Sequence, residues 1–192
     1  MRLSLTTHQA RLRNALYRYR PLAGSGAAET VWAAVAVLLA PDPDAVLLIH
    51  RAERSGDPWS GHFGLPGGRR DPGDLDLDET ARRETREEIG LDLDPAAQLG
   101  LLDDVWPRSA AAVPIIVRPF VYSLDQRPPL RTSAEVAEAF WVPLDVLADP
   151  ANYREARVRL QGREQDFPGY HLPQGLVWGL TERILTALLG LR

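Results

Sequence analysis

The sequence contains no cysteine, and all 22 of its lysine and arginine residues are arginine. The missing cysteines exclude disulfides, thiolate nucleophiles and thiolate metal ligands, and they leave the redox compartment undetermined. The missing lysines exclude Schiff-base chemistry, attachment of pyridoxal phosphate and the lysine of a phosphate-binding loop. Any phosphate binding must therefore depend on arginine side chains, backbone amides or a metal ion.

An excess of positive charge and a long apolar run are also missing. The net charge is −4 at pH 7, whereas a protein that binds a nucleic-acid backbone usually carries a basic face. No stretch supplies the roughly 20 apolar residues of a membrane-spanning helix, and the first residues lack the apolar core of a signal peptide. We therefore expect a cytoplasmic protein that binds neither nucleic-acid polymers nor membranes, with a homodimer as one possible assembly.

Length and periodicity predict one compact domain of the α/β class. A chain of 192 residues, 45% of them hydrophobic, can bury a single core. We divide it into an N-terminal helix and linker, residues 1–28, and a domain, residues 29–192. Alternating strands and few helices predict a mixed, partly antiparallel sheet with helices on its faces.

The expected elements follow from the apolar periods and the turn residues. Helices are predicted at residues 7–19, 76–89 and 173–189, with a helical turn at 144–147. Strands are predicted at 31–40 and 45–51, which form a hairpin, and at 99–106, 113–124 and 137–142, followed by a hairpin at 158–167. Pro107, Pro114 and Pro119 are expected only at sheet edges or bulges, because proline cannot donate a backbone hydrogen bond.

The chain is organised around residues 66–91, where glycines lead into a short helix capped by Asp76 and Gly90. Glu84, Glu87 and Glu88 stand at i, i+3 and i+4, so they project from one side of this helix. Like charges at that spacing repel by roughly a few tenths of a kcal/mol for each pair, so a compensating charge is expected. A cation such as Mg²⁺ prefers carboxylate oxygens and phosphates. The alternative is a solvated, charged surface face.

The same stretch resembles a known family. The run RETREEIGL, residues 83–91, is similar to the second half of the Nudix hydrolase box, and Pro66-Gly67-Gly68 stands in the place of its first half. Thr85 replaces an aliphatic residue, and the spacing from Gly68 to Arg83 is one residue longer than the general pattern. That longer spacing is similar to the coenzyme A diphosphatase branch, as are the runs WVPL at 141–144 and WGLT at 178–181. Leu65 departs from the phenylalanine usual in that branch.

The resemblance spans roughly residues 31–189 and implies a Nudix-type α/β/α sandwich. It implies metal-dependent hydrolysis of a diphosphate bond in a small-molecule nucleotide, with coenzyme A or its thioesters as substrate and 3′,5′-ADP and 4′-phosphopantetheine as products. The cofactor would be Mg²⁺ or Mn²⁺. Glu84, Glu87 and Glu88 are the expected metal ligands, with Glu87 also a candidate for water activation, and Arg83 would orient a glutamate. A further carboxylate from a distant loop would be Glu135, with Glu138 as the second choice.

Residues 52–65 are expected to form a substrate-recognition loop beside the acidic helix. Arg51, Arg54, Trp59 and His62 are its candidate contacts, and Gly67 and Gly68 would let the backbone approach a metal or phosphate closely. A solvated turn with Trp59 tucked into the core is the alternative.

Two other functions stay open. One is a Nudix hydrolase acting on ADP-ribose or an oxidised nucleotide, and the other is a non-catalytic nucleotide-binding regulatory module. The loops that choose a substrate cannot be assigned from a fold resemblance.

Overall fold

The structure, a computed structural model, describes residues 6–26, 29–54, 59–107, 114–160 and 162–191. Four predicted segments lie partly outside these ranges. They are the linker at 27–28, the recognition loop at 55–58, the fourth strand at 113 and the last hairpin at 161. The helices are α1 (Thr7–Arg18), α2 (Leu77–Ile89), α3 (Leu144–Ala148) and α4 (Gly179–Leu189), with 3₁₀ turns at Pro95–Ala97 and Pro150–Asn152. No described helix combines the length and apolarity needed to cross a membrane.

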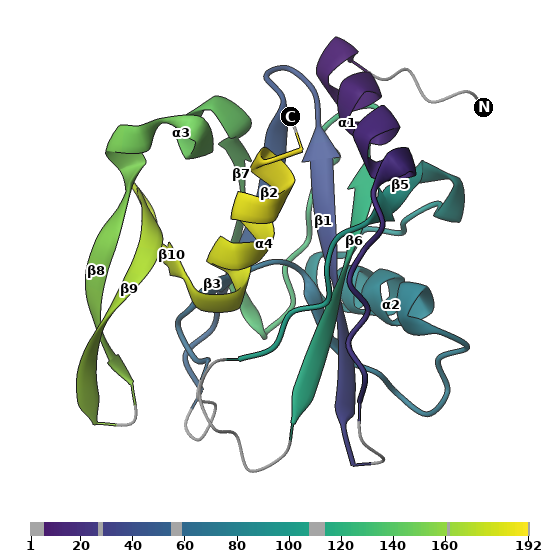
Figure 1. Cartoon of the computed structure of the whole chain (residues 1–192). Helices are drawn as coiled ribbons and strands as arrows, with labels where there is room; N and C mark the ends of the chain where they lie inside the picture. Colours follow the sequence, from purple (N-terminus) through teal and green to yellow (C-terminus); the bar gives the residue numbers. More distant parts are fainter. Residues whose placement is uncertain (1–5, 27–28, 55–58, 108–113, 161, 192) are drawn as a thin grey trace.

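The described strands form two sheets (Figure 1). The larger contains β1 (Val31–Ala40), β2 (Ala45–Arg51), β3 (Phe63–Gly64), β4 (Gly67–Arg69), β5 (Gln98–Leu101), β6 (Ile115–Ser123) and β7 (Val136–Pro143). Its order is β3-β2-β1-β6-β5, while β4 also pairs with β1 and β7 with β2. The smaller sheet joins β8 (Tyr153–Leu160), β9 (Arg163–Leu172) and β10 (Gly175–Trp178), and its β8–β9 end projects away from the larger sheet (Figure 1).

Strand β1 is the centre of the larger sheet. It runs parallel to β6 along nearly its whole length, and on its other edge it pairs with β2 at just two positions, Leu39 with Val46 and Ala40 with Ala45. The predicted hairpin is therefore present, but its strands then diverge. Strand β4 takes the place beside β1, with Gly68 opposite Ala34. This short strand brings Gly67 and Gly68 to the middle of the sheet.

Helices cover both faces of the larger sheet, as predicted. Successive residues of β1 point to opposite faces, and Ala36 and Leu38 join a core cluster with Ile89 of α2. Val37 and Leu39 join the other cluster, which includes side chains of α1 and α4. The structure therefore confirms the α/β/α sandwich with a mixed sheet.

The ends of α2 confirm the predicted caps. The Asp76 carboxylate accepts a hydrogen bond from the Glu79 backbone N–H at 2.8 Å, which satisfies one free amide of the first turn. Gly90 has φ 68°, the left-handed conformation that glycine adopts at low cost. Ala81, Thr85 and Ile89, which recur every four residues along the helix, are fully buried.

The prediction for the last helix was wrong at its start. Pro173 lies in the turn between β9 and β10, and Val177 is paired with Tyr170 in their ladder. Helix α4 begins at Gly179 instead, after an extended Trp178. The apolar spacing that includes Val177 suits a helix, but strand pairing outweighs that local pattern because it satisfies backbone groups with a neighbouring chain segment.

Other boundaries also differ. The hairpin β8–β9 is longer than the predicted 158–167, and the strand predicted at 99–106 ends at Leu101, with an isolated bridge at Val105. Pro119 lies inside β6, between β1 and β5, not at an edge. The β5–β6 ladder ends at Phe120, and the Pro119 carbonyl accepts from the Leu102 N–H at 3.1 Å. The proline therefore sits where β5 leaves β6, so its missing N–H interrupts little pairing.

The N-terminal helix and linker are held by the domain. Leu12 and Leu16 belong to the same core cluster as side chains of β1 and α4. The linker backbone is held by two carboxylates: Asp103 accepts from the Leu22 N–H and Asp104 from the Gly24 N–H, both at 2.8 Å. We propose that residues 1–28 and 29–192 fold as one unit.

Replacing Leu12 by alanine tests this proposal. The side chain is 1% exposed, so its truncation should lower the free energy of unfolding by about 2–5 kcal/mol through a cavity in the shared core. Urea unfolding followed by circular dichroism and tryptophan fluorescence should show one coincident transition. The exposed Arg11→Ala on the same helix should change little, and two separate transitions would contradict the proposal.

Candidate active site

A cavity of about 1010 Å³ opens beside the larger sheet. Its walls come from β1, the segment around β3 and β4, helix α2, strand β9 and the start of α4. Eight of the residues predicted to form the site line it: Arg51, Trp59, His62, Gly67, Gly68, Glu84, Glu88 and Glu135. Arg54, Arg83 and Glu87 are not among the lining residues. Arg54 forms an ion pair with Glu135 and Arg83 with Glu84, whereas Glu87 pairs with Arg83.

Glu88 is the buried carboxylate of the site, with 3% of the residue exposed. Its Oε2 accepts the Gly67 backbone N–H at 2.9 Å, and its Oε1 lies 3.8 Å from Arg51 Nη1. Burial raises the pKa of Glu88 to about 8, and the charge of Glu84 adds to that effect, whereas the Gly67 N–H and Arg51 oppose it. Position 67 requires glycine, because φ is 153° and a Cβ would lie 2.2 Å from the Ala34 carbonyl oxygen.

Glu84 borders the same cavity one helical turn earlier. Its Oε1 accepts from Arg83 Nη1 at 2.9 Å. Burial raises the pKa of the Glu84 carboxyl, and Arg83 works in the opposite direction. A Cβ on Gly68 would lie 2.4 Å from Glu84 Oε1. The Glu84 carboxylate can therefore pack against β4 only because position 68 has no side chain.

Glu87 does not line the cavity, although its position in the sequence places it on the same side of the helix as Glu84 and Glu88. Its side chain is 54% exposed, and its Oε2 accepts from the same Arg83 Nη1 at 3.0 Å. Within the described parts of the chain, no three histidine, aspartate or glutamate side chains stand close enough together to enclose a metal ion. Arg83 therefore supplies part of the compensating charge that the repulsion between the glutamates requires.

Asp74 also binds Arg83, and the sequence did not predict this role for it. It accepts from Arg83 Nε at 2.9 Å and Nη2 at 3.1 Å, and from the Thr80 hydroxyl at 2.9 Å. The Arg83 guanidinium holds the pKa of Asp74 at about 2. Asp74 directly follows the turn of Asp71, Pro72 and Gly73, but nothing local distinguishes it from Asp76, since its role depends on a partner nine residues away.

Arg54 has a different described partner from the substrate contact expected for it. Its Nη1 donates to Glu135 Oε1 at 2.9 Å, while Glu135 also lines the cavity. Glu138, the second choice for a distant carboxylate, is exposed and is not a lining residue.

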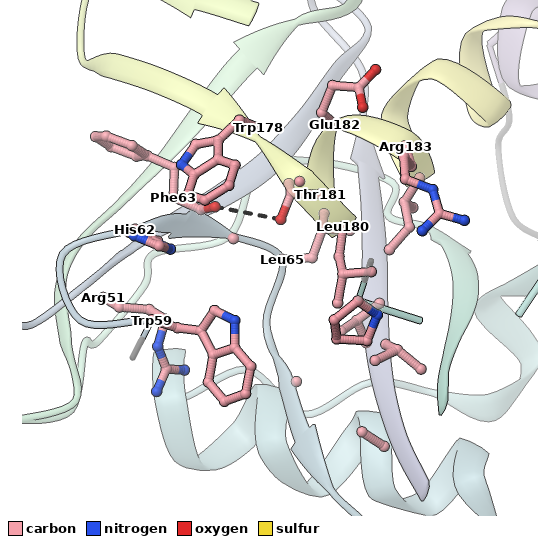
Figure 2. Close-up of a pocket in the computed structure, with 18 of the residues that line it drawn as sticks. Arg51, Trp59, His62, Phe63, Leu65, Trp178, Leu180, Thr181, Glu182 and Arg183 are labelled. Carbon is pink, nitrogen blue, oxygen red and sulfur yellow. Dashed lines mark hydrogen bonds between the residues drawn. The ribbon is translucent and has the colours of Figure 1, made fainter. Parts of the chain in front are cut away.

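The expected recognition loop does reach the cavity. Trp59 is 39% exposed and is not tucked into the core. It lies across the cavity from the start of α4, and His62 packs edge-on against Trp178 with ring centroids 5.1 Å apart (Figure 2). The loop therefore contacts the end of β10 at the edge of the cavity.

The NUDIX domain model matches residues 30–160, which include β1, β4 and the acidic helix. The chain belongs to the Nudix hydrolase family. This membership makes it a hydrolase of diphosphate bonds, an enzyme that acts on small nucleotide substrates.

Three similar proteins illustrate the range of this family. An uncharacterized protein of Schizosaccharomyces pombe is 41% identical over 121 residues, which are 60% of this chain but 36% of that protein. The mitochondrial coenzyme A diphosphatase NUDT8 of Homo sapiens is 35% identical over 173 residues, 84% of this chain and 71% of the relative. The NUDIX domain of Shewanella oneidensis NrtR, solved with ADP ribose, is 26% identical with a TM-score of 0.51, covering 75% of this chain and 88% of that one.

Replacing Asp74 by asparagine tests the network behind the site. Loss of one partner of a buried ion pair should lower the free energy of unfolding by about 3 kcal/mol at pH 7. The folded pKa of Asp74 is about 2, below its ordinary 3.8. The carboxylate therefore stabilises the fold above about pH 4, and this contribution is lost as the pH falls toward 2.

Denaturant unfolding of both proteins between pH 7 and pH 2 measures the effect. The difference between them should shrink at low pH. Asp92→Asn, at a side chain that is 84% exposed, should match the unsubstituted protein throughout. A difference that stays constant down to pH 2 would contradict the assignment.

Proposed function

We propose that the protein hydrolyses the diphosphate bond of coenzyme A or its thioesters, giving 3′,5′-ADP and 4′-phosphopantetheine. The observation that carries the chemistry is the pair of cavity-facing carboxylates, Glu84 and Glu88, set against the glycines of β4. The choice of coenzyme A is supported by the similarity to a human coenzyme A diphosphatase over most of both chains.

Nudix hydrolases generally use divalent metal ions, and the residues present fit Mg²⁺ or Mn²⁺. The donors are carboxylate oxygens, which suit a hard cation. Burial raises the pKa of both Glu84 and Glu88, so a cation beside them would favour their charged forms. Glu84 and Glu88 would hold the metal. Glu87, the third ligand predicted from the sequence, would have to leave Arg83 to join them. The bound ion would neutralise phosphate charge and lower the pKa of a water.

The protein's own groups prepare this reaction. Arg83, itself held by Asp74, orients Glu84 and Glu87, while the Gly67 N–H fixes one oxygen of Glu88. Arg51 lies beside Glu88 and supplies positive charge toward the phosphates.

Residues around the carboxylates would complete the reaction. Glu135, held by Arg54, is the candidate to accept a proton from the attacking water. Trp59 and His62 offer contacts to the rest of the substrate from the loop side of the cavity.

A second candidate keeps the fold and replaces the ligand by ADP-ribose. It is favoured by the similar NUDIX domain that was solved with ADP ribose. That ligand would suit either a hydrolase or a non-catalytic regulatory module. The cytoplasmic location and the possible homodimer stay predictions, and the similar human protein is named as mitochondrial.

Replacing Glu88 by glutamine tests the metal assignment, because the amide keeps the size of the side chain and removes its charge. Turnover should fall at least about a hundredfold, equivalent to ~2.7 kcal/mol. Titration calorimetry should show weaker Mg²⁺ and Mn²⁺ binding, with an unchanged circular dichroism spectrum. Glu164→Gln, at an exposed position of β9, is the matched control. Normal turnover in Glu88→Gln would remove the assignment.

A substrate panel tests the choice of substrate. Coenzyme A, dephospho-coenzyme A, ADP-ribose and an oxidised nucleotide are each incubated with Mg²⁺ and with Mn²⁺, and products are identified by mass. We expect 3′,5′-ADP and 4′-phosphopantetheine from coenzyme A at the highest kcat/KM. Cleavage of ADP-ribose with coenzyme A left intact would replace the first candidate by the second.

A further inference from the structure

The cavity has two chemically different sides (Figure 2). Arg51, Trp59 and His62 stand on one side, where charge and ring nitrogens are available. Leu65 and Leu180 stand on the other (Figure 2). We call this second side the apolar wall and define it by six lining residues: Ala33, Val35, Leu65, Ile115, Val117 and Leu180.

The apolar wall is the part of the main core that borders the cavity. Ala33, Leu65 and Val117 are buried members of that core cluster, whereas Ile115 and Leu180 are partly buried and pack against it. Strands β1 and β6, Leu65 and the first turn of α4 therefore each present apolar side chains to the cavity. Water against such a surface is unfavourable, so a ligand group without polar atoms gains free energy by replacing it.

The size of the cavity points to a long ligand. Its volume of about 1010 Å³ lies at the upper end of the range of roughly 300–1,000 Å³ found for drug-sized ligands. Glu84 and Glu88 occupy one part of the lining, so a diphosphate held there leaves space for a substituent that extends to the apolar wall.

The geometry points to the apolar wall as the binding site for the acyl chain of a coenzyme A thioester, an inference that rests on the proposed function. An acyl chain is uncharged and has no hydrogen-bonding groups along its length, which matches six side chains that offer none. A nucleobase or a 3′-phosphate needs polar or cationic partners, which the side with Arg51 and His62 supplies. Arg183, near Leu180, donates instead to the Trp106 carbonyl at 2.8 Å (Figure 2).

A series of thioesters tests this inference. The kcat/KM values of coenzyme A and its acetyl, butyryl, hexanoyl and octanoyl thioesters are measured under one metal condition. Each methylene that reaches the wall should raise kcat/KM about fourfold, which is the ~0.8 kcal/mol of a buried methylene expressed as a ratio. Equal values for coenzyme A and all its thioesters would overturn the acyl site while leaving the proposed function intact.

Variants of Leu180 test whether the dependence of kcat/KM on acyl chain length arises at the apolar wall. Leu180→Trp fills the space and Leu180→Asn makes the wall polar at similar size, so either should cut kcat/KM for octanoyl-coenzyme A at least tenfold and change that for acetyl-coenzyme A less than about twofold. Leu180→Met keeps volume and apolarity and should retain the chain-length dependence. Equal losses for both thioesters in correctly folded variants would reject a role in chain binding.

Binding without turnover gives an independent measurement. Titration calorimetry of octanoyl- and acetyl-coenzyme A in the presence of a chelator should show tighter binding of the octanoyl ester, and Leu180→Asn should remove that preference. Equal affinities for the two esters would overturn the acyl site. Cleavage of ADP-ribose with no cleavage or binding of any coenzyme A derivative would reject the proposed function and the acyl site together.

Discussion

The structure depends on one hydrogen bond at the centre of the site: the Gly67 backbone N–H donates to the buried Glu88 carboxylate. Gly67 belongs to β4, which pairs with the central strand β1, while Glu88 belongs to α2, which packs on the same strand. Any shift between helix and sheet would leave a buried carboxylate without this partner, which is costly in a low-dielectric interior. The packing of α2 on the sheet and the position of the Glu88 carboxylate therefore depend on each other.

Charge in the site is divided between buried and exposed groups. Asp74 holds Arg83, and Arg83 holds Glu84 and Glu87, so a single guanidinium serves three carboxylates. Arginine suits this role because its planar group offers five donors, and the chain has no lysine to compete for it. Glu88, outside this network, has Arg51 at 3.8 Å and the strongly raised pKa. The burial of Glu88 at the cavity wall is the feature that most favours a divalent cation.

The smaller sheet and α4 explain how a common fold obtains an individual cavity. Strands β9 and β10 bring the rings of Phe167 and Trp178 into contact, with their centroids 5.0 Å apart, and Trp178 directly precedes α4. Leu180, in the first turn of α4, then faces the cavity opposite the loop that carries Trp59 (Figure 2). In this proposal, substrate choice depends on these late elements, whereas the proposed metal-binding carboxylates, Glu84 and Glu88, depend on β1, β4 and α2 for their positions.

The sequence by itself determined the acidic helix, its caps at Asp76 and Gly90, and the α/β class, because these depend on spacing and on conformational preferences within a few residues. It also determined the family, through residues 83–91. The tertiary structure alone decided that Glu88 is buried while Glu87 is exposed, that Asp74 anchors Arg83, and that Val177 belongs to a strand. Each of these results depends on a neighbour distant in sequence or on the sheet beneath the helix, and local spacing carries no information about either.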